Sequence, residues 1–170
     1  MNSKKNLVFL GMMGSGKSSI GFLVSKKLKL KFYDIDNMIE SQVGEKISII
    51  FKEKGEVFFR EIEEEITLRI LKTHNNVISL GGGGFLNQKI RNEVLANNSS
   101  IWLSWDFQTL LKRIKNSQKR PLVLNLTNQE IKNLIKERIK IYSKAKFKIN
   151  CNNLTKTEIV NKVTKIYELN

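Results

Sequence analysis

The residues best suited to chemistry form a glycine-rich stretch near the amino terminus, Gly11 to Ser19, with the sequence GMMGSGKSS. It fits the phosphate-loop pattern G-x-x-x-x-G-K-[ST] and lies between a short apolar run, 7–10, and an amphipathic segment. Glycines let successive backbone N–H groups turn toward phosphate oxygens, and a following helix adds the positive end of its dipole. Lys17 can then reach the β- and γ-phosphates, and the Ser18 hydroxyl can ligate Mg²⁺. The stretch predicts nucleoside triphosphate binding, in a kinase, a GTPase or a motor ATPase.

Two aspartates follow the next short apolar segment, in Tyr33-Asp34-Ile35-Asp36. If a strand runs through them, alternation places both carboxylates on the same side, at the edge where ligands bind. One carboxylate can hold Mg²⁺, directly or through water, and the other can take a proton from a substrate hydroxyl. The structural alternative is that Asp36 caps the helix that follows it. The two roles are compatible.

Arg60 lies in a helical, acid-rich stretch, Val57 to Glu63. A guanidinium there can clamp a substrate carboxylate through two parallel hydrogen bonds. The structural alternative is an ion pair within the helix, with Glu56 or Glu64. The sequence leaves both readings open.

Three further features lie in the second half of the chain. Gly81 to Gly84 follow an apolar run, which favours a close backbone approach to a ligand over a merely flexible turn. Arg120 precedes the single proline, Pro121, in a polar loop of the kind that closes over phosphates; the alternative is a solvated charge. Arg138 lies in the middle of a long helical pattern, where the alternative is a surface arginine.

Strand and helix patterns alternate along the whole chain. We predict strands at 7–10, 30–34, 77–80, 100–104 and 147–151. We predict helices at 17–29, 36–43, 46–73 with a break near Gly55, 87–97, 106–116, 128–145 and 156–168. This order indicates an α/β fold with three layers, in which helices cover both faces of a five-stranded parallel sheet. Right-handed crossovers bring the carboxyl ends of the strands to one edge. The 170 residues are expected to form a single domain.

Composition excludes several classes of function. The single cysteine, Cys151, rules out a disulfide within the chain, and the single histidine, His74, makes a His/Cys metal cage implausible. The sequence has no apolar run of the roughly 20 residues that span a bilayer and no signal-peptide pattern, so we expect a cytoplasmic protein. The formal charge of +14 can indicate an anionic partner, but we favour lysines scattered over solvated helix faces, with no nucleic-acid or membrane partner.

Six segments in this order resemble the shikimate kinases, a family of P-loop kinases of the nucleoside monophosphate kinase type. They are GMMGSGKSS, DIDNMIE, IFKEKGEVFFREIE, VISLGGGG, KRPL and ERIKIYSKAK, and they extend from about residue 5 to residue 150. The resemblance implies transfer of the γ-phosphoryl group of ATP, with Mg²⁺, to the 3-hydroxyl of shikimate, a step of chorismate and aromatic amino acid biosynthesis. It implies a substrate-binding lobe over about 36–64 and a lid over about 116–127. We expect a monomer.

The resemblance also implies roles for individual residues. Asp36 would contact the shikimate hydroxyls as the candidate base, and Asp34 would help to hold Mg²⁺ together with Ser18. The remaining shikimate contacts would come from Arg60, Arg138, Gly81, Gly82 and Gly83. Glu63 would orient Arg60. The nucleotide would be bound by Gly14, Ser15, Gly16, Lys17, Ser18 and Ser19, with Arg113 stacked on adenine and Arg120 reaching the phosphates from the lid.

Three rival functions are compatible with part of the sequence. A gluconate kinase would share the phosphate loop and the fold, but the two arginines, Asp36 and the glycine run favour shikimate. A nucleic-acid-dependent ATPase would need a basic face with aromatic platforms, and most aromatic residues here lie in apolar runs. A GTPase-like switch would need a guanine-reading N-K-x-D motif, which does not follow the loop.

Overall fold

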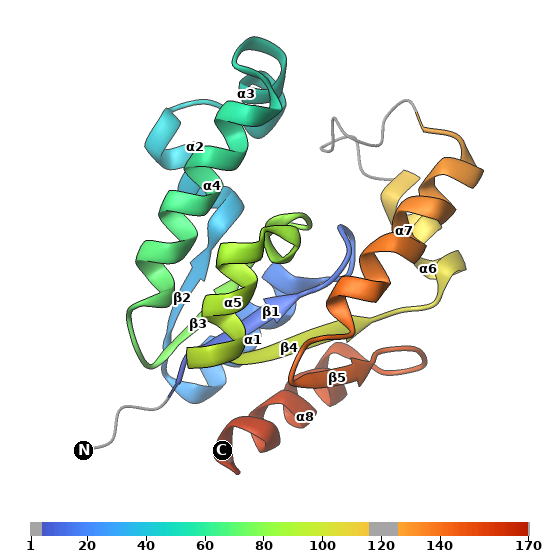
Figure 1. Ribbon diagram of the computed structural model, residues 1–170. Helices are drawn as coiled ribbons and strands as arrows, with labels where there is room; N and C mark the ends of the chain where they lie inside the picture. Colours follow the sequence, from blue (N-terminus) through green and yellow to red (C-terminus); the bar gives the residue numbers. More distant parts are fainter. Residues whose placement is uncertain (1–4, 116–125, 170) are drawn as a thin grey trace.

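The computed structural model describes residues 5–115 and 126–169. At its centre is a five-stranded parallel sheet with the strand order β2-β3-β1-β4-β5, and helices cover both of its faces (Figure 1). The strands are β1 (Leu7–Leu10), β2 (Lys31–Asp34), β3 (Asn76–Ser79), β4 (Ser99–Ser104) and β5 (Phe147–Asn150). The helices are α1 (Lys17–Leu28), α2 (Ile35–Val43), α3 (Ile47–Glu53), α4 (Gly55–Leu71), the short 3₁₀ helix η1 (Gly84–Leu86), α5 (Gln88–Asn97), α6 (Phe107–Lys115), α7 (Asn128–Tyr142) and α8 (Lys156–Glu168). The predicted α/β fold is confirmed.

The alternation of side chains along β1 divides the core into two layers. Leu7 and Phe9 pack with apolar residues of α1 and α8, whereas Val8 and Leu10 pack with those of α4, α5 and α7. All four side chains are buried, because a central parallel strand has helices on both faces. The apolar run that precedes the phosphate loop is therefore rigidly held, and the loop is anchored at the carboxyl end of the central strand.

The elements begin and end within a few residues of their predicted positions. β1 and α8 match, and Gly44, with φ of 79°, ends α2 where the break was expected. A residue without a side chain adopts this left-handed conformation readily. α7 ends earlier than predicted, at Tyr142, and a turn then leads into β5.

The aspartate pair is arranged differently from the prediction. β2 ends at Asp34, and α2 begins at Ile35, so strand alternation does not relate the two carboxylates. The helix cap is Asp34, not Asp36: its backbone is extended and its Oδ1 accepts the N–H of Asn37 at 3.2 Å. Asp36 lies in the first helical turn. The alternative reading of Asp36 as the cap is wrong because the helix begins directly after the strand, at Ile35, so that Asp36 lies inside it.

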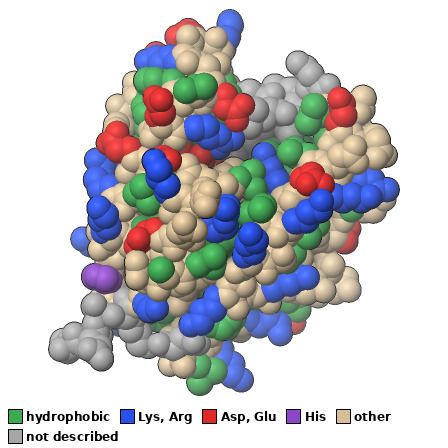
Figure 2. Space-filling model, viewed as in Figure 1, with side chains coloured by type: hydrophobic (Ala, Val, Ile, Leu, Met, Phe, Trp, Pro, Cys, Tyr) green, Lys and Arg blue, Asp and Glu red, His purple; other side chains and the backbone are tan. Residues whose placement is uncertain are grey.

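Charged side chains are spread over the surface. In Figure 2, Lys and Arg side chains are distributed across the visible face, with Asp and Glu among them, and they do not merge into one basic patch. His74 is exposed in the turn before β3, as expected. Among the described residues, none of the helices has the length and apolar character needed to cross a membrane. Of the expected lid, residues 116–125, including Arg120, lie outside the described residues.

Candidate active site

A pocket at the carboxyl edge of the sheet brings together residues from six parts of the chain. The phosphate loop, α2, α3, α4, the glycine run after β3, and α7 all contribute to its walls. The charged lining residues are Asp36, Arg60, Glu63 and Arg138, and the apolar ones are Met13, Ile47, Phe51 and Phe59, with Gly81, Gly82 and Gly83 completing the wall. The structure therefore places the predicted acceptor-binding residues around one cavity.

Arg60 is fixed on α4 by two carboxylates. Its Nη1 donates to Glu63 Oε2 at 2.6 Å, while Nε and Nη2 donate to Glu56 Oε1 at 3.2 and 3.1 Å. Burial alone lowers the pKa of Arg60, but attraction to Glu63 and the hydrogen bonds of both carboxylates outweigh burial, so the pKa is raised. The expected contact with Glu63 is present, and the pair with Glu56 is present as well. Glu64 instead accepts from Asn87 and Lys89.

Glu63 is the most deeply buried acid of the pocket, with 2% of its side chain exposed. Its Oε1 has no hydrogen-bond partner among the described residues. Burial raises the pKa of Glu63, as does the nearby charge of Asp36, although Arg60 opposes both effects. Glu63 therefore holds Arg60 with one oxygen and leaves a second polar atom inside the pocket region.

Arg138 projects from α7 and is buried rather than on the surface. Its Nη1 lies 3.5 Å from the Gly82 carbonyl oxygen and 3.8 Å from Met12 Sδ, and its Nε has no partner among the described residues. Tyr142, one turn later, donates to the same carbonyl at 2.5 Å. Burial raises the pKa of Tyr142 to about 12, so the hydroxyl stays protonated and able to donate.

The glycine run comes so close to these side chains that larger residues would not fit. A Cβ at Gly81 would lie 2.6 Å from Glu63 Oε1 and 2.7 Å from Asp36 Oδ1. A Cβ at Gly83 would lie 2.5 Å from Arg60 Nη1. Real Cβ atoms avoid contacts this short, so either substitution would displace the charged groups. The glycines thus allow a close approach between backbone and site.

The phosphate loop has the geometry expected of its sequence. Lys17 is buried, and its Nζ donates to the carbonyl oxygens of Gly11 and Met12 at 2.9 and 3.1 Å. Gly16 has φ of 89° and leads directly into α1, whose first residues include the exposed Ser18 and Ser19. The buried Ser15 Oγ has no hydrogen-bond partner among the described residues. The loop therefore presents polar groups and leads into the amino-terminal end of α1.

Two serine hydroxyls lie close together beside the loop, and an aspartate lies on the neighbouring strand. Ser18 Oγ lies 3.5 Å from Ser79 Oγ, at the end of β3. Asp34, at the end of β2, is the register partner of Ser79 in the sheet. The position of Ser79 was not predicted as part of the site. Its place at the carboxyl end of a strand was the available signal.

Arg113 lies on the outer side of the phosphate loop. Its guanidinium carbon is 3.8 Å from the centroid of the Trp105 ring, and its Nη1 donates to the Gly14 carbonyl at 3.3 Å. The indole N–H of Trp105 donates to the Ser15 carbonyl at 2.9 Å. Trp105 follows β4 at the ligand edge and was also missed in the sequence analysis.

The site thus has two parts, a pocket with acids and arginines and a phosphate loop beside it. Met13 of the loop lines the pocket, so the two parts are adjacent. The family model for shikimate kinases matches residues 13–168. The chain belongs to the shikimate kinase family.

Individual members of this family match nearly the whole chain. A shikimate kinase of Sulfurihydrogenibium sp. strain YO3AOP1 is 41% identical over 163 residues, which cover 95% of this chain and 98% of the relative. One of Persephonella marina is 39% identical over 159 residues, covering 94% and 96%.

Solved structures agree with this assignment. A shikimate kinase from Acinetobacter baumannii in complex with shikimate superposes with a TM-score of 0.89 at 26% identity, covering 96% of this chain and 92% of that one. The shikimate kinase from Aquifex aeolicus gives 0.86 at 36% identity, covering 96% of both chains. A deoxyadenosine kinase from M. mycoides shares the fold alone, with a TM-score of 0.61 at 17% identity.

Proposed function

We propose that the chain transfers the γ-phosphoryl group of ATP to the 3-hydroxyl of shikimate. The observation that carries this proposal is the pocket in which Arg60, Arg138 and Asp36 line the same cavity next to the phosphate loop. Shikimate has one carboxylate and three ring hydroxyls, so it needs cationic donors at one end and an acceptor at the other. A pocket with two arginines and one carboxylate supplies both.

The arginines bind the shikimate carboxylate, each through donors that suit a planar anion. The backbone of Gly81–Gly83 and the apolar residues Phe51 and Phe59 line the rest of the cavity and can contact the ring. This arrangement orients the ring so that a hydroxyl faces Asp36. Orientation of this kind supplies much of the rate enhancement of a phosphoryl transfer.

The nucleotide phosphates occupy the loop. Backbone N–H groups of residues 14–19 and the positive end of α1 bind the phosphate oxygens. Lys17 exchanges its hydrogen bonds to the Gly11 and Met12 carbonyls for the β- and γ-phosphates. Arg113 stacks on the base, and we propose that Arg120, which lies outside the described residues, adds a positive charge to the phosphate site.

The residues beside the loop fit a magnesium ion. Mg²⁺ prefers oxygen ligands and keeps several waters, and Ser18, Ser79 and Asp34 present two hydroxyls and a carboxylate at neighbouring strand and helix ends. Ser18 would ligate the ion directly and Asp34 through water. When bound, the ion neutralises charge on the β- and γ-phosphates.

Asp36 aligns the acceptor hydroxyl and takes its proton. A bond forms between the 3-oxygen of shikimate and the γ-phosphorus, the bond from that phosphorus to the β–γ bridging oxygen breaks, and ADP leaves with this oxygen. Lys17 and Arg120 stabilise the charge that develops on the transferred group. We propose a monomeric enzyme whose product, shikimate 3-phosphate, feeds chorismate biosynthesis.

A coupled assay for ADP release tests this proposal. Purified protein with MgATP should release ADP when shikimate is added, and neither gluconate nor the absence of an acceptor should replace it. Binding of ATP without any response to shikimate would contradict the proposal.

Asp36→Asn tests the role of the base. The variant should lose more than about a hundredfold in kcat, because both hydroxyl alignment and proton transfer depend on the carboxylate. Its Kd for ADP, measured by calorimetry, should remain that of the parent. An equal loss of ADP binding would show that Asp36 acts on the nucleotide instead.

A further inference from the structure

Trp105 is the most prominent residue near the site that the proposed mechanism leaves without a role. It lies between β4 and α6 and is only partly buried. Its ring faces the guanidinium of Arg113, and its indole N–H is bonded to the phosphate loop at Ser15. Two separate contacts therefore join one side chain to two groups that the nucleotide would touch.

The phosphate loop and α6 are in direct contact around this side chain. Gly14 packs against Arg113 so closely that a Cβ at Gly14 would lie 3.2 Å from the Arg113 Cβ. Arg113 in turn donates to the Gly14 carbonyl. The guanidinium is thus held by an aromatic face on one side and by the loop at its edge, and it has little freedom to rotate.

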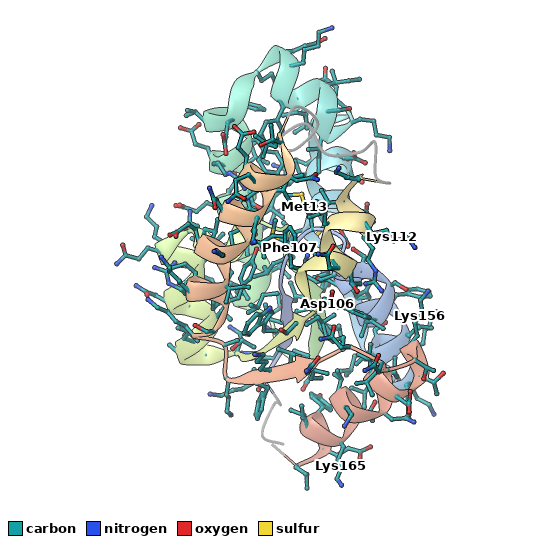
Figure 3. All side chains as sticks on the ribbon, turned by 90° about the vertical axis from the view of Figure 1, so that its right-hand side faces the viewer. Met13, Asp106, Phe107, Lys112, Lys156 and Lys165 are labelled. Atoms are coloured by element: carbon teal, nitrogen blue, oxygen red, sulfur yellow. The ribbon has the colours of Figure 1, made fainter. Side chains whose placement is uncertain are left out.

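The segment after β5 lies beside this cluster. The N–H of Asp106, next to Trp105, donates to Asn152 Oδ1 at 3.0 Å, and the N–H of Cys151 donates to the Ser104 carbonyl at 2.9 Å. Figure 3 views the molecule from the side of α6, with Asp106 and Lys112 facing the reader, and shows Lys156 at the start of α8 on the same side. Cys151 and Asn152 are therefore hydrogen-bonded to the residues on either side of Trp105.

We propose that Trp105 is a positioning residue for the nucleotide base, the inner layer of a three-layer stack in which the Arg113 guanidinium is the middle layer and the base of ATP or ADP is the outer one. This proposal rests on the proposed function for the identity of the nucleotide. It adds a residue to the site and explains how a flexible arginine becomes a flat platform.

Physical chemistry favours such a stack. A guanidinium is planar and weakly hydrated, and it stacks on aromatic faces on both sides. The indole ring is the strongest cation–π partner among the side chains. Because Trp105 fixes the plane of Arg113 before the nucleotide arrives, less side-chain entropy is lost when the base binds. Burial raises the pKa of Cys151 and the Arg113 charge opposes this effect, so Arg113 lies near the segment after β5.

A purely structural role for Trp105 makes a different prediction. In that case the indole would stabilise the phosphate loop through its bond to Ser15, and its loss would weaken the binding of any polyphosphate. A base platform, by contrast, matters only to ligands that carry a base. Inorganic tripolyphosphate and ADP therefore distinguish the two roles.

The experiment is calorimetric titration of the full chain with ADP and with tripolyphosphate. Trp105→Leu should weaken ADP binding about five- to tenfold, the range of one partly desolvated cation–π contact. Its Kd for tripolyphosphate should stay within about twofold of the parent, a difference too small to reflect a lost contact. Equal weakening of both ligands would overturn the proposal.

Two further variants keep the test decisive if Trp105→Leu does not fold. Trp105→Phe retains a ring but loses the indole N–H, so it should lose about two- to threefold for ADP, since Phe is the weaker cation–π partner. Arg113→Leu should reproduce the full ADP loss, again without affecting tripolyphosphate. In a double-mutant cycle, the variant with both Trp105→Phe and Arg113→Leu should bind ADP no more weakly than Arg113→Leu alone. Independent, additive losses would refute a shared stack.

The control is Phe22→Leu, which removes an exposed ring that faces the Lys26 ammonium on α1. It should leave both Kd values unchanged. None of these titrations contains shikimate. If the variants change the Kd for ADP as expected but shikimate is not phosphorylated, only the proposed function is contradicted. If shikimate is phosphorylated but Trp105→Leu weakens ADP and tripolyphosphate equally, only the stack is contradicted.

Discussion

The acceptor pocket contains one arginine on α4, here called the α4 wall, and one on α7, the α7 wall. The surroundings of the two positive charges differ. On α4, Arg60 lies between Glu56 and Glu63 and donates to both. On α7, Arg138 forms no ion pair with any of the described residues; its Nη1 lies 3.5 Å from the Gly82 carbonyl oxygen, and the Tyr142 hydroxyl is a second polar neighbour. Arg138 is also the more deeply buried of the two, since Arg60 is only half-buried.

The two arginines therefore prepare the pocket for an anion in different ways, one as a paired charge and the other as an unpaired one. The α4 wall is largely neutralised before the substrate arrives, because the carboxylates that orient Arg60 also balance its charge. The α7 wall keeps a desolvated cation whose Nε has no partner in the described part of the chain. The Glu63 carboxylate of the same pocket interacts with the Arg138 charge without forming an ion pair with it. A buried charge with no ion-pair partner in contact is stabilised further when an anion binds. Arg138 should therefore contribute more to carboxylate affinity, and Arg60 more to the stability of the pocket.

Arg138→Met should produce the largest effect. We expect KM for shikimate to rise about a hundredfold or more, because a desolvated charge pair is lost from the complex. The free protein should be as stable as the parent or more stable, since Met replaces a buried unpaired charge with an apolar chain of similar length. Steady-state kinetics and urea unfolding measure the two quantities.

The matched control is Lys136→Met, which removes an exposed charge from the same helix. It should change neither KM nor the urea midpoint. A strongly destabilised Arg138→Met protein would mean that Arg138 is already compensated in the free chain, and the contrast between the walls would fail.

Arg60→Gln should affect affinity less and stability more. KM for shikimate should rise about tenfold, and the free energy of unfolding should fall by about 1–3 kcal/mol at pH 7, because Glu63 is left buried without its cation. Arg69→Gln, in the last turn of α4, removes an exposed arginine and is the control. A larger KM effect from Arg60→Gln than from Arg138→Met would reverse the comparison.

The stability loss in Arg60→Gln should also depend on pH. The folded-state pKa of Glu63 is raised mainly by burial, and removing Arg60 removes the main opposing influence. For an acid with a raised folded pKa, stability is present below the unfolded pKa and falls as the pH rises through the folded pKa. Urea unfolding of the variant should therefore recover toward the parent as the pH is lowered from 7 toward the ordinary glutamate value of 4.5. A loss of stability independent of pH would show that the Glu63 charge is not its cause.

The fold could be predicted from the sequence because the same hydrophobic pattern recurs at each strand. Apolar runs of four or five residues alternate with amphipathic segments, and the order of elements then selects a parallel sheet. Sequence reasoning reached Lys17 through the spacing of the phosphate-loop motif, whereas the roles of Arg60 and Arg138 came from the resemblance to the shikimate kinases. Their detailed geometry in the structure, such as the pairing of Arg60 with both Glu56 and Glu63, depends on side-chain packing that spacing alone does not specify.

The features that sequence reasoning missed depend on tertiary contacts. Asp34, not Asp36, caps α2, since one residue decides where the strand becomes a helix. The burial of Arg138 depends on α7 packing over the glycine run, far away in the sequence. Trp105 contacts Ser15 across 90 residues. A periodic pattern identifies the buried face of a helix, but it does not show which polar group on another element faces it.

Tyr142 lies on α7 beside Arg138, and its replacement should have the smallest effect of the variants compared. Its hydroxyl donates to the Gly82 carbonyl, the same oxygen that Arg138 approaches. Tyr142→Phe should lower stability by about 1 kcal/mol, the usual net value of one buried hydrogen bond, and should raise KM for shikimate only about two- to threefold. The folded pKa of Tyr142 is about 12, above the ordinary value of 10.0, so its contribution is complete below pH 10 and is lost as the pH rises toward 12. Urea unfolding at pH 9 and pH 11 should therefore show the parent losing more stability than Tyr142→Phe. Parallel losses would indicate that the tyrosine ionises normally in the folded protein, and that the α7 wall is more accessible to water than its burial implies.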